Sequence, residues 1–565
     1  MAASRFWSAV FRAAQVFTGL AVVFMTGWNA YISLRLRPDL PTVAINLAFW
    51  FVPPLVLLAV SGRPWRSLAL GAALTFVLQR LHWLKWRYLE HTWTAADFRF
   101  ATDRANWVIL RQYPEILAFT VVCLSLLALS WLLMPRGARV AWKTRVGSAL
   151  VAAGLVGGVF HWQAAHTFDP FGFNIYGHFA NLVFSASTLT YHPPAVDGSS
   201  ASFLARAAAL PLESATEAVS PTSAQAAPLP DLVVWLQESA MDLRLLELPG
   251  ARLPALAMYT PDAHTRSHGW LRVPSWGGST WLSEFALLTG LSHEDFGPSG
   301  NGVYYSVTPH VQYTLPKLLK QHGYRSVALS GSPKAFYNME TGQRELGFDE
   351  VLNPLDFPGW GGKSVVTHLI GDDELGRYAL EVLSRPHEQP LLLFVLSIVQ
   401  HGPYDARHPI THHLDRAGLD RGSAGRLSDY VARMMATSTA NETFGGQVLR
   451  GPRPVVFAYF GDHQPNLGAP ARYVAGVANA HFVTSYAIKT NFPASAPLDY
   501  AGPLDIAFLG GAILEHAGLP LDTFFRANRA MRLLCEGRLT DCPDQALVNS
   551  YKAHVYRDLQ AARPN

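Results

Sequence analysis

The hydrophobic pattern divides the chain into two parts of different character. Before residue 170, apolar residues gather in five runs, at about 13–33, 42–61, 65–84, 115–135 and 146–165. Each run is close to the ~20 residues that a helix needs to cross a bilayer. The pattern therefore predicts an α-helical membrane domain with five spans over residues 1–170.

Basic residues between these runs predict how the membrane domain is oriented. Arg5 and Arg12 precede the first run, Arg63 and Arg66 separate the second from the third, and a basic cluster at 136–145 separates the fourth from the fifth. These segments lie on one side if all five runs span, and short basic loops stay in the cytoplasm. We therefore expect a multi-pass protein integral to the membrane, with everything after residue 170 on the extracytoplasmic side.

The pattern changes after a connecting segment and linker at residues 171–230, whose second half is rich in Ala, Ser and Pro. Four short apolar runs then end in small and polar residues: DLVVWLQES, HGYRSVALSGS, QPLLLFVLSIVQHGPY and PVVFAYFGDHQP. Helix-like segments alternate with them: TLPKLLKQHG, DDELGRYALEVLSR and LSDYVARMMATSTA. Strands buried on both faces and alternating with helices predict an α/β domain with a mainly parallel central sheet over residues 231–565.

Candidate chemistry falls at the ends of the predicted strands, where the sites of such sheets lie. Glu238 ends the first strand, and Asp462 and His463 end the strand PVVFAYFGDHQP. Thr280 opens a helix after the turn GGS. Two carboxylates, an imidazole and a hydroxyl together suit one divalent cation, of which Mn, Mg and Zn remain open. The helix N-terminus adds backbone N–H groups that favour an anion.

Each signal also has a purely structural interpretation. Ser279 or Thr280 would cap the helix, with Glu284 completing the cap. An Asp-His pair is often structural, and His401, in QHGPY, would be a turn residue instead of a contact to a substrate oxygen. A functional site is favoured because these residues all fall where the strands of one predicted sheet end.

Composition narrows the class of protein. Hydrophobic residues make up 50% of the 565 residues and charged ones 15%, which suits a membrane protein with a large soluble part. The net charge of +4 gives no indication of nucleic-acid binding. Of three cysteines, Cys123 lies in an apolar run, whereas Cys535 and Cys542 would pair in an extracytoplasmic domain and stay thiols in a cytoplasmic one.

The same motifs carry a resemblance to a known family. In order they are LQES, GGSTWLSEFALLTG, HGYRSVALSGSPKAFYN followed by LGFDE, QHGPY and FGDHQP. As a set, together with the five-run N-terminal part, they resemble the sulfatase-type members of the alkaline phosphatase superfamily. Within these, the chain is similar to lipoteichoic acid synthases and to the bacterial phosphoglycerol transferases that modify periplasmic glucans. The resemblance implies a location in the bacterial cytoplasmic (inner) membrane.

The resemblance also implies residue roles. Thr280 would be the nucleophile, and Glu238, Asp462 and His463 would be metal ligands with it. His401 would contact the substrate.

Tyr337 and Asn338 would lie by the head-group pocket. Lipoteichoic acid synthases tend to have an Arg after this Asn, whereas this chain has Met339, and Lys334 is a candidate replacement. The same head group is therefore not assured.

The implied reaction transfers the head group of a membrane phospholipid, as phosphoglycerol, through a Thr-linked intermediate to a glycan or another hydroxyl acceptor. Three alternatives stay open: a phosphoethanolamine transferase, a sulfatase or phosphodiesterase with water as acceptor, and a non-catalytic binding subunit. No C/S-x-P-x-R motif of true sulfatases stands near residues 276–284.

Overall fold

A computed structural model describes most of the chain. The described residues are 40–89, 139–164, 190–210, 228–248, 252–363, 370–386, 388–402, 419–467, 477–493 and 502–563, with isolated positions between these ranges. The chain forms two compact units, Met1–Thr190 and Tyr191–Asn565, and each is described by itself.

The first unit contains three long described helices, α2 (Leu40–Ser61), α3 (Pro64–Leu89) and α7 (Trp142–Ala164). They correspond to the second, third and fifth predicted runs. The run at 13–33 is described only at separate helical positions, and the run at 115–135 lies mostly outside the described residues. None of the helices in the described part is at once long and apolar enough to cross a membrane. The five-span membrane domain therefore stays a prediction.

Close helix packing holds this unit together. A Cβ on Gly71 of α3 would lie 2.6 Å from the Pro54 ring and backbone of α2, so glycine permits this approach. Pro54 stands inside α2, and Arg145 of α7 donates from Nε to the carbonyl of Ala59 at 2.9 Å and from Nη2 to that of Val60 at 2.8 Å. Backbone carbonyls near the end of α2 thus find a charged donor.

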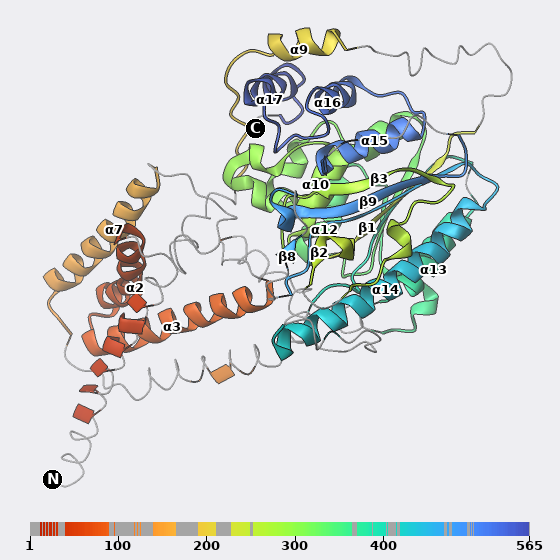
Figure 1. Cartoon of the computed structure of the whole chain (residues 1–565). Helices are drawn as coiled ribbons and strands as arrows, with labels where there is room; N and C mark the ends of the chain where they lie inside the picture. The colour runs from red at the N-terminus through yellow and green to blue at the C-terminus, as the bar shows by residue number, and fades with distance from the viewer. Residues whose placement is uncertain are drawn as a thin grey trace. The chain divides into compact units, whose positions relative to one another are not determined.

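An eight-stranded sheet forms the centre of the second unit (Figure 1). Its order is β10-β3-β9-β7-β1-β6-β4-β5. The bounds are β1 Asp231–Gln237, β3 Thr265–Arg272, β4 Arg325–Ser330, β5 Glu350–Leu352, β6 Leu391–Leu396, β7 Val455–Gly461, β9 Val483–Thr490 and β10 Leu504–Asp505. A separate antiparallel pair joins β2 (Leu246–Glu247) to β8 (Arg472–Tyr473).

The predicted mainly parallel sheet is confirmed for its central part and corrected at one side. β1, β6, β7, β4 and β5 pair in parallel. β9 runs antiparallel to both β7 and β3, so the sheet is mixed. The four predicted apolar runs are β1, β4, β6 and β7, and every residue of β1, β6 and β7 is buried.

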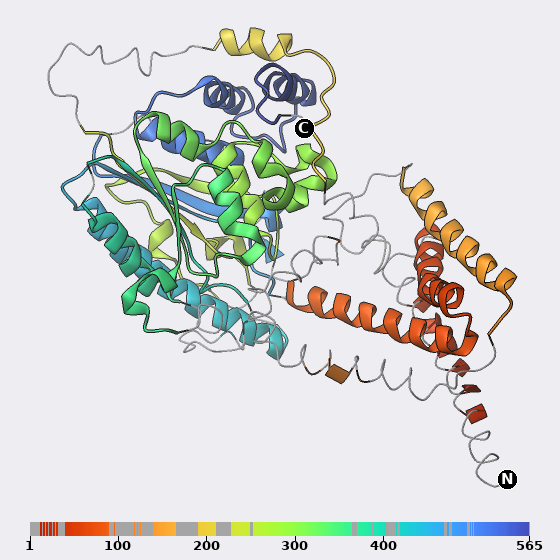
Figure 2. The same ribbon diagram turned by 180° about the vertical axis from the view of Figure 1, so that it is seen from behind.

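Helices cover both faces of the sheet, as the two opposite views show (Figures 1 and 2). α13 (Asp372–Ser384) and α14 (Arg421–Leu449) lie on one face, where Trp235 of β1 packs edge-on against Phe444 with ring centroids 4.9 Å apart. The other face carries α10 Thr280–Thr289, α11 Leu315–Gln321, α12 Met339–Glu345, α15 Leu509–His516 and α16 Thr523–Leu534. α11, α13 and part of α14 match the helix-like segments of the sequence.

Part of the predicted linker belongs to the second unit. Residues Ala201–Ala208 form a helix, α9, which lies on α16 and α17 (Gln545–Lys552). Phe203 is 1% exposed and packs edge-on against Tyr551, with ring centroids 5.2 Å apart. Its backbone N–H donates to Ser550 Oγ at 3.0 Å, and Ser550 Oγ donates to the Ser199 carbonyl at 2.7 Å. A composition rich in Ala and Ser hides this helix, because one buried aromatic supplies most of its apolar contact.

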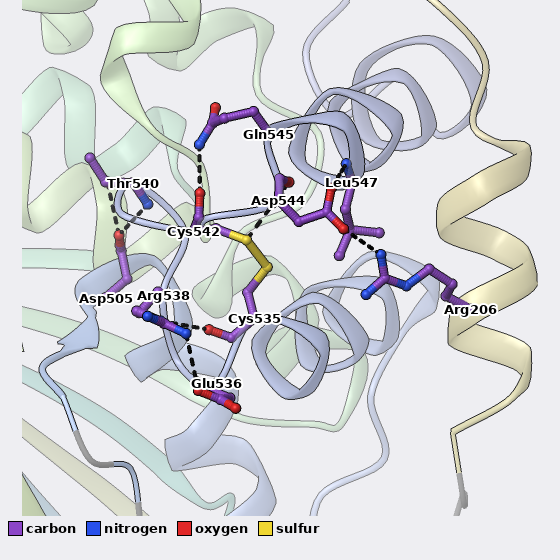
Figure 3. The surroundings of a disulfide bond; sticks show 10 residues. All are labelled: Arg206, Asp505, Cys535, Glu536, Arg538, Thr540, Cys542, Asp544, Gln545 and Leu547. Atoms are coloured by element: carbon purple, nitrogen blue, oxygen red, sulfur yellow. Dashed lines mark hydrogen bonds and ion pairs between the residues drawn. A yellow bond between two sulfur atoms is a disulfide. The ribbon is translucent and has the colours of Figure 1, made fainter.

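Cys535 and Cys542 form a disulfide, one of the two outcomes left open by the sequence (Figure 3). Asp544, two residues beyond Cys542, caps α17 and pairs with Arg206 of α9 at 2.6 Å. Thr540, inside the disulfide loop, donates to Asp505 at the end of β10 from both its N–H, at 3.1 Å, and its hydroxyl, at 2.9 Å. The loop therefore connects the α9–α17 layer to the sheet.

The buried aromatic of α9 gives a stability prediction. Phe203→Ala should reduce the free energy of unfolding by about 3–5 kcal/mol, because the substitution removes a fully buried ring and leaves a cavity. Leu204→Ala, at a side chain that is 44% exposed, should change it by less than about 0.5 kcal/mol. Thermal unfolding of the full chain in detergent, with both variants, measures the difference; equal melting temperatures would mean that α9 does not pack as described.

Candidate active site

The neighbouring parallel strands β6, β1 and β7 all end at the same edge of the sheet. The register pairs Gln237 with Gly461 and Leu236 with Leu396. The next residues along each strand, Glu238 and Asp462 and the loop that begins at 397, therefore lie side by side. The sequence prediction that these strand ends meet is confirmed.

Gly461 lets the chain that follows β1 pass close to the end of β7. A Cβ at this position would lie 1.7 Å from the carbonyl oxygen of Ala240, a distance that no side chain permits. The backbone N–H of Ser239 donates to Asp462 Oδ1 at 2.7 Å, and the hydroxyl of Ser239 donates to Glu238 Oε1 at 2.8 Å. These bonds fix both carboxylates relative to the strand ends.

Thr280 is the first residue of α10, and its hydroxyl donates to Glu238 Oε2 at 2.8 Å. The turn before it needs unusual backbone angles: φ is 73° at Gly277 and 70° at Ser279, in the left-handed region. The N–H of Gly277 also donates to the Gln464 carbonyl at 3.0 Å, which holds the turn against the end of β7. The turn thus aims Thr280 at the two carboxylates.

The helix-cap interpretation is not what the structure shows. Ser279 occupies the N-cap position, but its side chain makes no capping hydrogen bond. Glu284 does not complete a cap, since its carboxylate accepts bonds from Tyr304, Tyr337 and Gln343. The turn is therefore built for the position of Thr280 instead of for capping.

Glu238, Asp462 and His463 form a buried group that can hold a metal ion. Each offers one ligand atom, and these atoms all lie within 4.8 Å of one another. His463 Nε2 lies 3.3 Å from Glu238 Oε1 and 3.4 Å from Asp462 Oδ2. Asp462 Oδ2 and His463 Nε2 are buried without a hydrogen-bond partner in the described part of the chain. Unpaired buried atoms of this kind are costly, and a divalent cation would satisfy both.

The electrostatics of this group separate its two carboxylates. Burial would raise the pKa of Glu238, but the charge of nearby His463 outweighs it and lowers that pKa. Burial and the charge of Glu238 raise the pKa of Asp462. Burial would lower the pKa of His463, yet the charges of Asp462 and Glu238 raise it. Two acids and one imidazole, buried together, form a donor set that suits a divalent cation.

His401 lies beside this group, in the loop after β6. Its charge is among the influences that lower the pKa of Glu238. Its Nδ1 contacts the Gly402 carbonyl at 2.7 Å, so a substrate oxygen would be bound by Nε2. Buried Arg433 of α14 donates to the carbonyls of His401, at 2.7 Å, and Val399, at 3.1 Å. Arg433 could not be predicted from the sequence, because nothing in its helical context distinguishes it from a surface arginine.

The structure gives the side chains of Tyr337 and Asn338 partners within the protein. Both residues have left-handed backbone angles, with φ of 40° and 63°. The Tyr337 hydroxyl donates to Glu284 Oε1 at 2.5 Å, and Asn338 Nδ2 donates to the Tyr304 carbonyl at 2.6 Å. The Tyr337 ring lies 5.3 Å from that of Trp281, next to Thr280. Their role in substrate binding stays a prediction.

Lys334 and Glu284, two further candidates from the sequence, both have partners within the protein. Lys334, considered as a replacement for a missing arginine, forms an ion pair with Asp356 at 2.7 Å. Glu284, considered as part of a cap, is fully buried on α10 and joins three segments through its hydrogen bonds. Burial raises the pKa of Glu284 to about 7, against the hydrogen bonds, which lower it.

The chain is similar to several known proteins. The family model described as "Sulfatase" matches residues 230–494. An uncharacterized protein of Haemophilus influenzae is 31% identical over 533 residues, 90% of this chain and 93% of that protein. The capsular polysaccharide biosynthesis protein RkpI of Rhizobium meliloti is 26% identical over 302 residues, and the match spans 52% of each chain.

One solved structure that matches is the Streptococcus pyogenes phosphoglycerol transferase GacH in complex with sn-glycerol-1-phosphate. It has a TM-score of 0.48 and 17% sequence identity, and the match covers 65% of this chain and 95% of that one.

The buried acid and imidazole group predicts metal content. The full chain should bind about one divalent ion per molecule, and Asp462→Asn or His463→Ala should lower the bound metal at least tenfold, since each removes a ligand. Glu284→Gln changes an equally buried carboxylate outside the group and should leave the metal content unchanged. Elemental analysis of the purified full chain measures this; equal metal in all four samples would place the ion elsewhere.

The raised pKa of Glu284 predicts a pH effect on stability. A carboxyl whose pKa rises on folding, here from 4.5 to about 7, contributes stability that is complete below pH 4.5 and is lost as the pH rises through 7. The loss should approach about 3 kcal/mol above pH 8. Melting temperatures of the wild type and Glu284→Gln between pH 5 and 9 test this. The melting temperature of the wild type should fall relative to that of the variant as the pH rises. Melting temperatures that change in parallel with pH would contradict the prediction.

Proposed function

Because the chain belongs to the sulfatase family of the alkaline phosphatase superfamily, we propose that it transfers a phospholipid head group, phosphoglycerol, to a glycan hydroxyl through a phosphodiester on Thr280. The observation that carries this proposal is the Thr280 hydroxyl at a helix N-terminus, bonded to Glu238 within a buried group that suits a divalent cation.

The first half of the reaction uses Thr280 as nucleophile. Its Oγ gives up the hydroxyl proton and forms a bond to phosphorus, the bond from phosphorus to the diacylglycerol oxygen breaks, and that oxygen takes up a proton. Glu238 accepts the hydrogen bond of the hydroxyl and so orients its lone pairs. The first N–H groups of a helix have no partner within it, and those of α10 are therefore suited to bind the phosphate.

A divalent cation held by Glu238, Asp462, His463 and Thr280 would lower the pKa of the hydroxyl and offset the charge of the phosphate. His401, in the loop after β6, would bind a phosphate or head-group oxygen through Nε2, since its Nδ1 contacts the Gly402 carbonyl. The second half of the reaction replaces Thr280 with a hydroxyl of the acceptor.

Three observations support the glycan acceptor and the extracytoplasmic location. RkpI, a relative over half of its length, is named for capsular polysaccharide biosynthesis. The disulfide of Cys535 and Cys542 suits an oxidising compartment. The apolar N-terminal runs would keep the site near the bilayer that contains a lipid donor. We therefore propose a multi-pass protein of the bacterial cytoplasmic (inner) membrane, with Tyr337 and Asn338 beside the head group.

Intact mass of the full chain in detergent, after incubation with phosphatidylglycerol or phosphatidylethanolamine, tests the proposal. The wild type should gain the mass of one phosphoglycerol. Thr280→Ala should form no adduct and lose transfer by about 10³-fold or more, whereas Thr280→Ser keeps a hydroxyl and should still form one.

The other outcomes are informative as well. A phosphoethanolamine adduct would keep the mechanism and change the head group. No adduct with either lipid in a folded, metal-loaded sample would contradict the transferase and favour a hydrolase or a non-catalytic subunit.

A further inference from the structure

A cavity of about 170 Å³ lies at the carboxyl ends of β3 and β10, apart from the Thr280 site. Arg272, the last residue of β3, and Asp505, the last residue of β10, line it together with Phe482 and with Ala286 of α10. No step of the proposed mechanism uses these residues. The volume suits one small ring or polyol and not a lipid chain.

The cavity opens on the same edge of the sheet as the proposed active site. β3 is antiparallel to β9, and β9 is antiparallel to β7, so β3 runs in the same direction as β7. The residues that follow β3 continue from the cavity wall, at Val273, directly to Thr280. Ala286 lies six residues after Thr280 on α10, which corresponds to about 9 Å along the helix axis. A short oligosaccharide bound in the cavity could therefore extend to Thr280.

The walls combine apolar surface with an unsatisfied donor. Phe482, Val273 and Ile506 are the large apolar residues that line it. Arg272 is 8% exposed and donates from Nη1 and Nη2 to the carbonyls of Asn479 and Ala478, each at 2.8 Å. Its Nε is buried without a partner in the described part of the chain. A bound hydroxyl would satisfy that N–H, whose burial is otherwise costly.

The charges around the cavity favour a neutral ligand. One cation, Arg272, stands against three carboxylates of Glu294, Asp505 and Asp541, and Asp541 pairs with Arg272 at 2.8 Å. His293 also lines the cavity, and burial lowers its pKa to about 3, so it adds no charge at neutral pH. A phosphate would meet net repulsion here, whereas hydroxyl groups can donate to the carboxylates and accept from Arg272.

The disulfide loop supplies one wall. Thr540 and Asp541 lie between Cys535 and Cys542, and Thr540 donates to Asp505, as Figure 3 shows. The wall is thus fixed covalently at the base of the loop and by hydrogen bonds at the sheet. A preformed wall reduces the entropy that a ligand loses on binding.

We propose that this cavity binds a neutral sugar unit of the acceptor glycan, an inference that rests on the proposed transferase reaction. The bound unit holds the chain so that a hydroxyl of the neighbouring unit reaches the Thr280 phosphodiester. That hydroxyl oxygen forms the new bond to phosphorus, the bond between phosphorus and Thr280 Oγ breaks, and the hydroxyl proton passes to Oγ.

The test separates the two half-reactions on the full chain in detergent. The adduct on Thr280 is formed first with phosphatidylglycerol, and its decay is then followed by intact mass with added β-linked glucose disaccharide, glucose tetrasaccharide or inorganic phosphate. Wild-type decay should accelerate saturably with the tetrasaccharide and not with phosphate. Phe482→Leu, which removes the aromatic face, should raise the half-saturating concentration about tenfold, and Phe482→Tyr should restore it. Both variants should form the adduct at the wild-type rate.

Binding of the same tetrasaccharide, measured by saturation-transfer NMR on the Thr280→Ala chain, gives a second readout that needs no chemistry. Ala286→Leu, which fills the cavity from α10, should abolish the signal in a chain that melts like its parent. Absence of any adduct would defeat the proposed function, and the NMR signal alone would then decide the cavity. A tetrasaccharide that neither binds nor shortens the life of the adduct, or that acts equally on Phe482→Leu, overturns the proposal.

Discussion

The parallel pairing of β1 with β7 is the constraint on which the site depends. It sets Glu238 beside Asp462 and His463 at one edge of the sheet. The loop after β1 adds a requirement for glycine at position 461, because the carbonyl of Ala240 occupies the space of a side chain. Two buried carboxylates at this separation repel one another unless a cation or a proton intervenes. The rest of the domain makes that arrangement tolerable: Ser239 bonds to both acids, and the Tyr430 hydroxyl on α14 donates to the Ser239 carbonyl at 2.7 Å.

Rigid support continues on both sides of the pair. On one face of the sheet, Arg433 of α14 binds the loop that carries His401, and its own charge is balanced by buried Asp429 at 2.7 Å. On the other face, Glu284 joins α10 to the turn at Tyr337 through a 2.5 Å hydrogen bond. Both networks hold a charged or polar group away from water and give it hydrogen-bond partners, which favours one geometry over its alternatives. The loop of His401 and the helix that begins at Thr280 are thus held by residues outside the group of Glu238, Asp462 and His463.

Short-range pattern in the sequence is enough to predict the central strands and the residues at their ends. Runs such as VVFAYF indicate buried parallel strands, and the polar residues that follow such runs include Glu238, Asp462 and His463. Features set by contacts between distant residues are not predictable in this way. β9 has no distinctive alternation and pairs antiparallel only because β3 and β7 flank it. Glu284 resembles a helix-cap residue until Tyr304, Tyr337 and Gln343 converge on it, and α9 resembles a linker until Phe203 meets Tyr551.

The docking of α9 has a mechanical consequence. Gly198 accepts a hydrogen bond from Arg557, Ser550 bonds to both Ser199 and Phe203, and the disulfide closes a loop between α16 and α17. A pull on the chain before residue 198 therefore reaches the last helices of the domain before it reaches Asp231, where β1 begins. Several hydrogen bonds between these helices and residues 198–203 resist the pull together. β1, which leads into Glu238, is in this way shielded from that pull, and the alignment of Glu238 with Thr280 is preserved.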